Sequence, residues 1–263
     1  MPTEKRERQR AGARARREAI ARHQKRRRRV RSSATVVVIA AVVIGSVYLI
    51  TKHSPTTFPD TAQGRLQAVW VKAGCPSTRV TRVNTLQYKE APPLTISTTA
   101  TYDATVKTDV GTFVISLDPK EAPTAVNSFV FLAKKGFFNC VIFQRVIRDF
   151  MDQTGDPTGT GTGGPGYSFH ESGPPTASPQ YPLGAVVYAT SSSDSTDPLD
   201  ESQWFVVTGP EGESLPPDYT LFGQVTSGMS VVQKINENGS VSTSETGTPT
   251  VYHRILSVKI KEA

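Results

Sequence analysis

Apolar and polar positions alternate along residues 102–107 and largely again along residues 112–117. A short polar segment that ends in Gly111 lies between them. Alternation with a period of two places the apolar side chains on one face of an extended chain. The pattern therefore predicts a β-hairpin with two half-buried strands.

The period changes after Pro123. Apolar side chains then recur three and four positions apart, and Gly136 follows two lysines as a stop signal. Because proline is tolerated in the first turn of a helix, this spacing predicts an amphipathic helix of about three turns. The same spacing predicts a second helix over residues 229–236.

The other apolar runs are short, and Gly, Pro and Ser dominate the segments that connect them. We predict strands at residues 141–147, 185–189, 204–207, 221–225 and 254–260. Strands far outnumber helices, so the pattern alone favours a closed barrel or a sandwich.

Residues 34–50 form a seventeen-residue segment without a charged side chain. As a helix it would extend roughly 26 Å, close to the thickness of a hydrocarbon core. We predict that residues 32–51 form a single transmembrane helix that stays in place as an anchor. A cleaved signal peptide and a buried soluble helix are the alternatives, but the long basic region before the segment and the poor cleavage site after it favour an anchor.

Positive charge is concentrated in residues 1–31, which hold 14 Lys or Arg and three Glu. This tail carries +11, so the remaining 232 residues carry −4 of the formal total of +7. We therefore expect no nucleic-acid partner for the folded part. Because cationic residues stay on the cytoplasmic side, we predict a cytoplasmic tail, membrane lipid contacted through residues 32–51, and an extracytoplasmic location for the rest. Anionic-lipid binding by the tail is an alternative to a pure topology signal.

Residues 52–95 are rich in Thr, Pro and Ser, and we predict an extracytoplasmic stalk there, followed by a globular domain at residues 96–263. Cys75 and Cys140 are the two cysteines of the chain. An oxidising compartment permits a disulfide between them, and two buried free thiols are the alternative.

Residues 143–156 read FQRVIRDFMDQTGD, and residues 159–164 read GTGTGG. These runs resemble the cyclophilin signature F-H-R-x-I-x-x-F-M-x-Q-x-G-D followed by G-T-G-x-G-G. Further blocks of the family match in the same order at residues 105–115, 122–129, 182–189, 202–207 and 221–225. The resemblance extends from about residue 101 to the end of the chain.

This resemblance implies a mainly β fold, with a closed eight-stranded antiparallel barrel capped by two α-helices. It also implies peptidyl-prolyl cis-trans isomerase activity on proline-containing peptides and on unfolded or folding proteins outside the cytoplasm. Such an activity needs no cofactor and no metal. The four histidines are scattered and lack metal-ligand spacing.

The resemblance also assigns roles to single residues. Arg145 matches the catalytic arginine of the family, whose guanidinium faces the prolyl amide. Positions that line the proline pocket or bind the substrate backbone are matched by Phe150, Met151, Gln153, Ala189, Thr190, Gln203, Phe205, Leu215 and Tyr219. From spacing alone, the apolar members of this set would be ordinary core residues.

Six positions depart from the family pattern. They are Gln144 for His, Thr154 for Gly, Thr190 for Asn, Glu201 for Gly, Ser214 for Trp and Tyr219 for His. Because these departures surround the expected pocket, a non-catalytic proline-peptide binding or scaffolding module at the membrane is the alternative function.

Overall fold

The computed structural model describes most of the chain from Phe58 onward, where the chain forms one compact unit. The described ranges are 58–79, 81–171, 181–190, 199–241 and 246–262. The predicted tail and the predicted membrane span at residues 32–51 lie outside them. Within these ranges, no helix is both long and apolar enough to cross a membrane.

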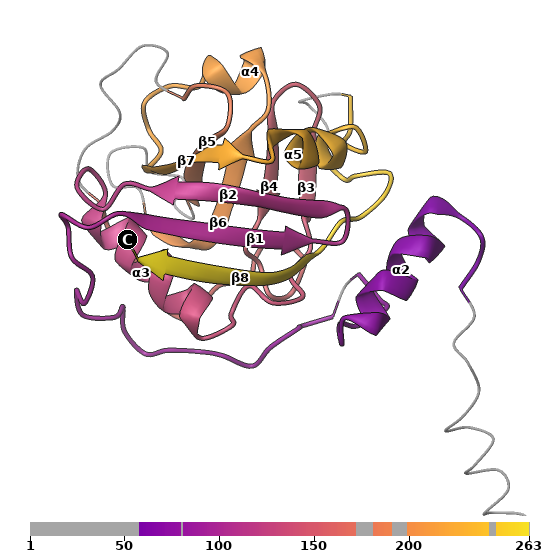
Figure 1. Cartoon of the computed structure of the whole chain (residues 1–263), viewed down its shortest axis with the longest axis horizontal. Helices are drawn as coiled ribbons and strands as arrows, with labels where there is room; N and C mark the ends of the chain where they lie inside the picture. The colour runs from indigo at the N-terminus through magenta and orange to yellow at the C-terminus, as the bar shows by residue number, and fades with distance from the viewer. Residues whose placement is uncertain (1–57, 80, 172–180, 191–198, 242–245, 263) are drawn as a thin grey trace, which may run out of the picture. The chain divides into compact units, whose positions relative to one another are not determined.

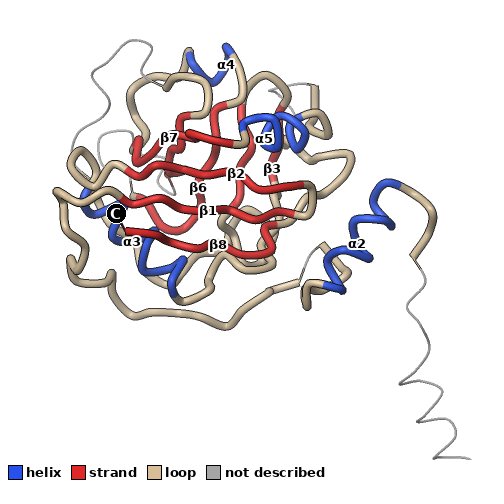
Figure 2. Tube along the Cα trace, in the orientation of Figure 1, coloured by secondary structure: helices blue, strands red, loops and turns tan. Residues whose placement is uncertain are grey.

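Eight strands form a single antiparallel sheet. Their bounds are β1 (Tyr102–Thr108), β2 (Gly111–Leu117), β3 (Arg145–Ile147), β4 (Met151–Thr154), β5 (Ala185–Thr190), β6 (Asp200–Val207), β7 (Leu221–Ser227) and β8 (Ile255–Glu262). They lie in the order β3-β4-β6-β5-β7-β2-β1-β8 (Figures 1 and 2). The predicted hairpin is confirmed as β1 and β2, which pair in register around the turn before Gly111.

The sheet curls into a half-barrel, and the predicted closed barrel is wrong. The edge strands β3 and β8 do not pair with each other. The segments before them meet only at one antiparallel bridge, between Ile142 and Arg254. The predicted strand at residues 141–147 is regular only from Arg145. The outer edge of β3 bonds to other segments: the Val146 N–H donates to the Gly247 carbonyl (2.8 Å), and the Val146 carbonyl accepts from the Ser240 N–H (3.0 Å).

The two predicted helices are present as α3 (Pro123–Lys134) and α5 (Met229–Asn236). The structure adds α2 (Ala62–Lys72) and the one-turn helix α4 (Pro210–Glu213), which the apolar pattern does not predict. Helix α2 begins at an N-cap: the Thr61 hydroxyl accepts from the backbone N–H of Gly64 (3.0 Å). The short β4 was also not predicted as a separate strand.

Alternate residues of β5 and β6 face two different clusters. Val186 and Trp204 belong to the main hydrophobic core, which also contains the buried face of α3. Val187, Phe205 and Val207 instead belong to a smaller cluster on the other face of the sheet. This second apolar surface is where a ligand can reach the sheet without entering the core.

Trp70 anchors α2 to the rest of the unit. Its side chain is 1% exposed, its ring centroid lies 4.5 Å from the guanidinium carbon of Arg254, and its indole N–H donates to Asp109 (2.5 Å). Arg254 is fully buried and donates to the carbonyls of Cys140 and Thr78. Burial lowers the pKa of Arg254 to about 10, and the nearby Asp109 opposes that shift. The buried cation is thus stabilised by a carboxylate, two carbonyls and an aromatic face.

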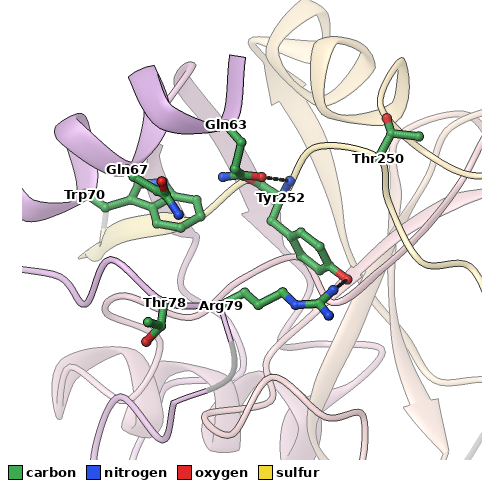
Figure 3. Close-up of a pocket in the computed structure, with 7 residues that line it drawn as sticks. All are labelled: Gln63, Gln67, Trp70, Thr78, Arg79, Thr250 and Tyr252. Atoms are coloured by element: carbon green, nitrogen blue, oxygen red, sulfur yellow. Dashed lines mark hydrogen bonds between the residues drawn. The ribbon is translucent and has the colours of Figure 1, made fainter. Parts of the chain in front are cut away.

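Two further contacts join the same parts. Figure 3 shows the Gln63 amide of α2 facing the backbone of Tyr252, where its oxygen accepts from the N–H (2.8 Å) and its nitrogen donates to the carbonyl (3.3 Å). Arg79 donates to the Tyr252 hydroxyl (2.5 Å). These side chains border a cavity of about 530 Å³, whose lining also includes Gln67, Trp70, Thr78 and Thr250 (Figure 3).

A disulfide joins Cys75, which follows α2, to Cys140, which follows α3; their Cα atoms are 5.3 Å apart. It closes a loop with a sequence separation of 65.

The Cys75→Ser/Cys140→Ser variant should lose about 4 kcal/mol of unfolding free energy, because the unfolded chain regains the entropy of that loop. Urea unfolding followed by tryptophan fluorescence measures the loss. Wild-type protein treated with dithiothreitol should unfold at the midpoint of the variant, and an unchanged midpoint in both would contradict the prediction.

Candidate active site

A row of side chains crosses three neighbouring strands on the outer face of the sheet. Arg145 of β3 lies directly opposite Gln153 of β4, and Gln153 lies opposite Phe205 of β6. Directly opposed residues point to the same face and contact one another. The register therefore brings a cation, an amide and an aromatic ring side by side.

The next row toward α5 is apolar. Met151 pairs with Ile147 on one side and with Val207 on the other, and all three are buried. The Arg145 guanidinium lies over this floor: its Nη1 is 3.8 Å from the Met151 sulfur, and its Cζ is 5.9 Å from the centroid of the Phe150 ring. The cation thus lies beside an apolar surface.

Arg145, Phe150 and Met151 border a cavity of about 190 Å³. Its lining contains Arg145 and eight of the nine residues matched to substrate-binding positions, namely Phe150, Met151, Gln153, Ala189, Thr190, Phe205, Leu215 and Tyr219. The ninth, Gln203, is hydrogen-bonded to Gln153 beside the cavity. Residues widely separated in the chain are therefore brought together.

Tyr219 is fixed at the rim by aromatic and backbone contacts. Its ring is edge-on to Phe205 (centroids 5.9 Å apart) and to Tyr181 (6.4 Å). The Tyr181 hydroxyl donates to the Tyr219 carbonyl (2.9 Å) and accepts from its N–H (3.0 Å). Burial raises the pKa of Tyr181 to about 12, so this hydroxyl stays protonated at neutral pH.

The Arg145 guanidinium is half-buried and forms no ion pair with a residue that the structure describes. Burial lowers its pKa, while Tyr219 opposes that shift. Its polar side-chain contact is with the side-chain amide oxygen of Gln153 (Oε1), which lies 3.5 Å from Nη1. Most of its donors therefore remain available to a ligand in the cavity.

Three glutamines form a hydrogen-bonded group beside Arg145. The Gln203 side-chain oxygen accepts from the amides of Gln153 (3.0 Å) and Gln144 (2.9 Å). Its nitrogen donates to the Gly161 carbonyl (2.9 Å). Gln144 was noted only as a departure from the family pattern, and its contact with Gln203 was not predicted.

Asp156 organises the glycine-rich loop that receives Gln203. Its carboxylate accepts from the backbone N–H groups of Thr158 (2.6 Å), Thr160 (2.9 Å) and Gly161 (2.6 Å). Burial raises the pKa of Asp156, but hydrogen bonds from the Thr158 hydroxyl and from the backbone N–H groups of Thr158, Gly163 and Gly161 outweigh burial and lower it. Gly163 is required here, because a Cβ would lie 2.1 Å from the Asp156 carboxylate. An aspartate before a run of Gly and Thr was the available signal for this role.

The departures from the family pattern are accommodated without distorting the cavity. Thr154 is buried and directs its hydroxyl to the Ile142 carbonyl, away from the ligand face. The Ser214 hydroxyl donates to the Pro210 carbonyl (2.9 Å) at the end of α4. Glu201 lies against Gly164, where a Cβ would be 2.0 Å from its carboxylate oxygen. In the described part of the chain, no three metal-binding side chains converge on one point.

Comparison with known proteins gives this arrangement a family. The family model described as cyclophilin type peptidyl-prolyl cis-trans isomerase/CLD matches residues 103–260. The chain belongs to the cyclophilin family. The match covers every strand except the ends of β1 and β8 and includes the whole cavity.

Similar proteins occur in fungi and bacteria. The peptidyl-prolyl cis-trans isomerase-like 1 protein of Emericella nidulans is 35% identical over 161 residues, which cover 61% of this chain and 96% of that protein. The probable peptidyl-prolyl cis-trans isomerase B of Mycobacterium leprae is 34% identical over 175 residues, 61% of this chain and 57% of that protein. The peptidyl-prolyl cis-trans isomerase of Helicobacter pylori is 38% identical over 143 residues, 51% of this chain and 80% of that protein.

Solved structures agree with the fold. A cyclophilin-type isomerase of Cryptosporidium parvum superposes with a TM-score of 0.53 at 24% identity, covering 61% of this chain and 98% of that one. Its structure in the presence of the dipeptide Ala-Pro gives a TM-score of 0.52 at 25% identity, covering 60% and 98%. The mainly β cyclophilin fold is therefore shown for this chain.

A buried carboxyl group next to the cavity strands makes the stability of this cyclophilin depend on pH. Asp200 pairs with Thr190 across β5 and β6, is 1% exposed, and accepts from the Thr220 hydroxyl (2.6 Å). Burial raises its pKa to about 7, and the Thr220 hydrogen bond only partly opposes the shift. In the unfolded chain the pKa is about 3.9. The folded state therefore binds a proton that the unfolded state has released, and stability falls as pH rises from about 4 to 7.

Asp200→Asn cannot ionise and should lose this part of the pH dependence. Between pH 5 and pH 8, the free energy of unfolding of the wild type should fall by about 2.5 kcal/mol more than that of the variant. Urea titrations at both pH values measure the difference, and comparison within the pair removes the contribution of the buried Asp152, which both proteins share. Equal pH slopes would show that Asp200 does not titrate in this range.

Proposed function

We propose that this cyclophilin isomerises X-Pro bonds in the cavity over β4 and β6, with Arg145 as the catalytic residue. The observation that carries the proposal is the position of the Arg145 guanidinium, half-buried and without a carboxylate partner in the described chain, beside an apolar floor. The activity that its relatives are named for requires a site of this kind.

The reaction needs positioning more than bond chemistry. An X-Pro bond prefers the trans isomer by only about 0.5 to 1 kcal/mol, but exchange takes tens to hundreds of seconds because partial double-bond character must be lost. In the twisted state the prolyl nitrogen gains a lone pair. A catalyst that donates a hydrogen bond to this nitrogen, and grips the ring meanwhile, stabilises the twisted state more than either planar isomer.

The cavity supplies both elements. Met151 and Phe205 are nearly fully buried and, with Phe150 and Leu215, offer an apolar surface for the prolyl ring. Arg145 supplies the donor, and its partial burial strengthens that hydrogen bond because less water competes for it than at the surface. Gln153 contacts Arg145 and restricts where its donors point. Ala189 and Thr190, at the half-buried end of β5, line the cavity where the substrate backbone would lie.

Arg145→Ala should lower kcat/KM by about 10²- to 10³-fold, the effect of removing one preorganised donor from a transition state. Two-dimensional exchange NMR on a proline-containing peptide, with the full chain in detergent micelles, measures the rate. Arg148→Ala is the matched control: Arg148 lies three positions away, is exposed, and donates to the Glu237 carbonyl rather than into the cavity. It should retain the wild-type rate, and an unchanged rate for Arg145→Ala would remove that residue from the mechanism.

The same experiment separates the alternative function. A proline-peptide binding module would broaden or shift the peptide resonances without enhancing exchange between the cis and trans signals. The departures Thr154, Ser214 and Tyr219 motivate this alternative. The Thr154 and Ser214 hydroxyls are hydrogen-bonded to backbone carbonyls, and the Tyr219 ring packs against Phe205, which is why catalysis is the function proposed.

We also propose that the chain is a bacterial, membrane-anchored cyclophilin whose isomerase domain lies outside the cytoplasm and assists protein folding there. Three features support this: the uncharged segment at 34–50 after a strongly basic tail, the Cys75–Cys140 disulfide, and the similarity to isomerases of two bacteria.

Single cysteine probes test the orientation. In intact cells, a membrane-impermeant maleimide should label Lys107→Cys, at an exposed position of β1, but not Ala11→Cys in the tail. Permeabilised cells provide the control, because both probes should then react. Labelling of the tail probe alone in intact cells would contradict the proposed orientation and indicate the opposite one.

A further inference from the structure

An extended segment before the family domain contacts the substrate-binding side of the molecule. Residues 76–96, called the strap below, lie outside the matched range 103–260 and contain no helix or strand among their described residues. The strap is fixed at both ends. The Cys75–Cys140 disulfide immediately precedes it, and the buried Asn127 accepts from the Thr95 N–H (3.0 Å) near its end.

Between these ends, the strap runs along the glycine-rich loop at residues 157–166. The Val83 N–H donates to the Pro157 carbonyl (2.9 Å), and the Tyr88 N–H donates to the Pro165 carbonyl (2.8 Å). The two backbones approach so closely that a Cβ on Gly166 would lie 2.8 Å from the Tyr88 carbonyl oxygen. The strap thus holds both ends of the loop.

One side chain of the strap bonds to the glycine-rich loop. The Gln87 amide nitrogen donates to the Gly164 carbonyl (2.8 Å) and to its neighbour, the Leu86 carbonyl (2.8 Å). Gln87 itself is exposed, so this contact is not a requirement of the core. It bonds to the residue directly after Gly163.

The opposite side of the loop faces the glutamine group of the active site. The carbonyls of Gly161 (2.9 Å) and Gly163 (3.2 Å) accept from the Gln203 amide. Gln203 in turn accepts from Gln153, the cavity residue next to Arg145. Two hydrogen-bonded groups, Gln87 on one side and Gln203 on the other, are therefore joined through the adjacent residues Gly163 and Gly164 of the loop backbone.

We propose that the strap is a positioning element for the isomerase site, and that Gln87 is its positioning residue. By holding the Gly164 carbonyl, Gln87 restricts rotation of the adjoining peptide that carries the Gly163 carbonyl, and hence the orientation of the Gln203 amide. Gln87 thereby affects how tightly the site binds an extended, proline-containing peptide whose backbone bonds to the Gln203 amide. The proposal rests on the proposed function, because it assigns the strap to the same site.

Gln87→Met keeps the length and volume of the side chain and removes its amide. We expect the dissociation constant for a proline-containing peptide, and KM, to rise about 2- to 5-fold, in the range of one lost hydrogen bond, with kcat unchanged. Backbone amides of residues 159–164 should exchange with deuterium faster by a similar factor. The thermal midpoint should not change, because the Gln87 side chain is exposed.

Gln63→Met is the matched control, since Gln63 also belongs to the segment before the family domain and bonds to backbone, but at Tyr252 and not at the loop. It should leave the dissociation constant and KM at their wild-type values. In a Gln203→Met background, Gln87→Met should have no further effect on peptide binding, because the connection through the loop backbone to the Gln203 amide is already broken.

The outcomes are distinct. Unchanged peptide binding in Gln87→Met, an equal effect of Gln63→Met, or full additivity with Gln203→Met would each overturn the proposal. If the wild-type chain binds the peptide without enhancing exchange, the isomerase assignment fails, but the dissociation constants and deuterium exchange still decide the role of the strap. A lower thermal midpoint with unchanged peptide affinity would reduce the strap to a stabilising segment and contradict the proposal.

Discussion

Register between β3, β4 and β6 determines which side chains reach the cavity. Arg145 lies opposite Gln153 and Gln153 lies opposite Phe205, so all three point outward. A slip of one residue in β3 would turn Arg145 toward the main core, where an unpaired cation costs several kcal/mol. The same slip would expose Val146, which is 1% exposed in the core. Core packing and cavity geometry are therefore enforced by one constraint, and the active site needs no separate scaffold.

The segment before the family domain adds a second layer of organisation. Trp70 and the disulfide fix its beginning to Arg254 and Cys140, and the strap then runs along the glycine-rich loop. Asp156 fixes that loop from within by accepting three backbone N–H groups. A loop of many glycines loses much conformational entropy when it becomes ordered, and these contacts offset that cost. Its order depends on contacts from outside the loop as well as from its own carboxylate.

Periodic features of the sequence were predictable, and features that depend on distant partners were not. The β1–β2 hairpin and α3 followed from local periodicity, because their apolar faces repeat over several residues. Helix α2 was not predicted, since its anchor, Trp70, depends on Arg254 at the far end of the chain. Sheet closure was predicted wrongly, because the free edge of β3 bonds to Gly247 and Ser240, which lie before β8 in the chain, and not to β8 itself. Cavity residues were assigned through resemblance to a family, whereas the contacts of Gln144 became visible only with the structure.

The division of β5 and β6 between two clusters affects how this protein can change over time. On β6, Trp204 and Val206 pack into the main core, while Phe205 and Val207 belong to the smaller outer cluster. Replacements at the outward positions alter the ligand surface without leaving a hole in the main core. Selection for folding and selection for client preference thus fall on alternate residues of the same strand. Such a separation allows new specificities to evolve while the fold keeps its stability margin.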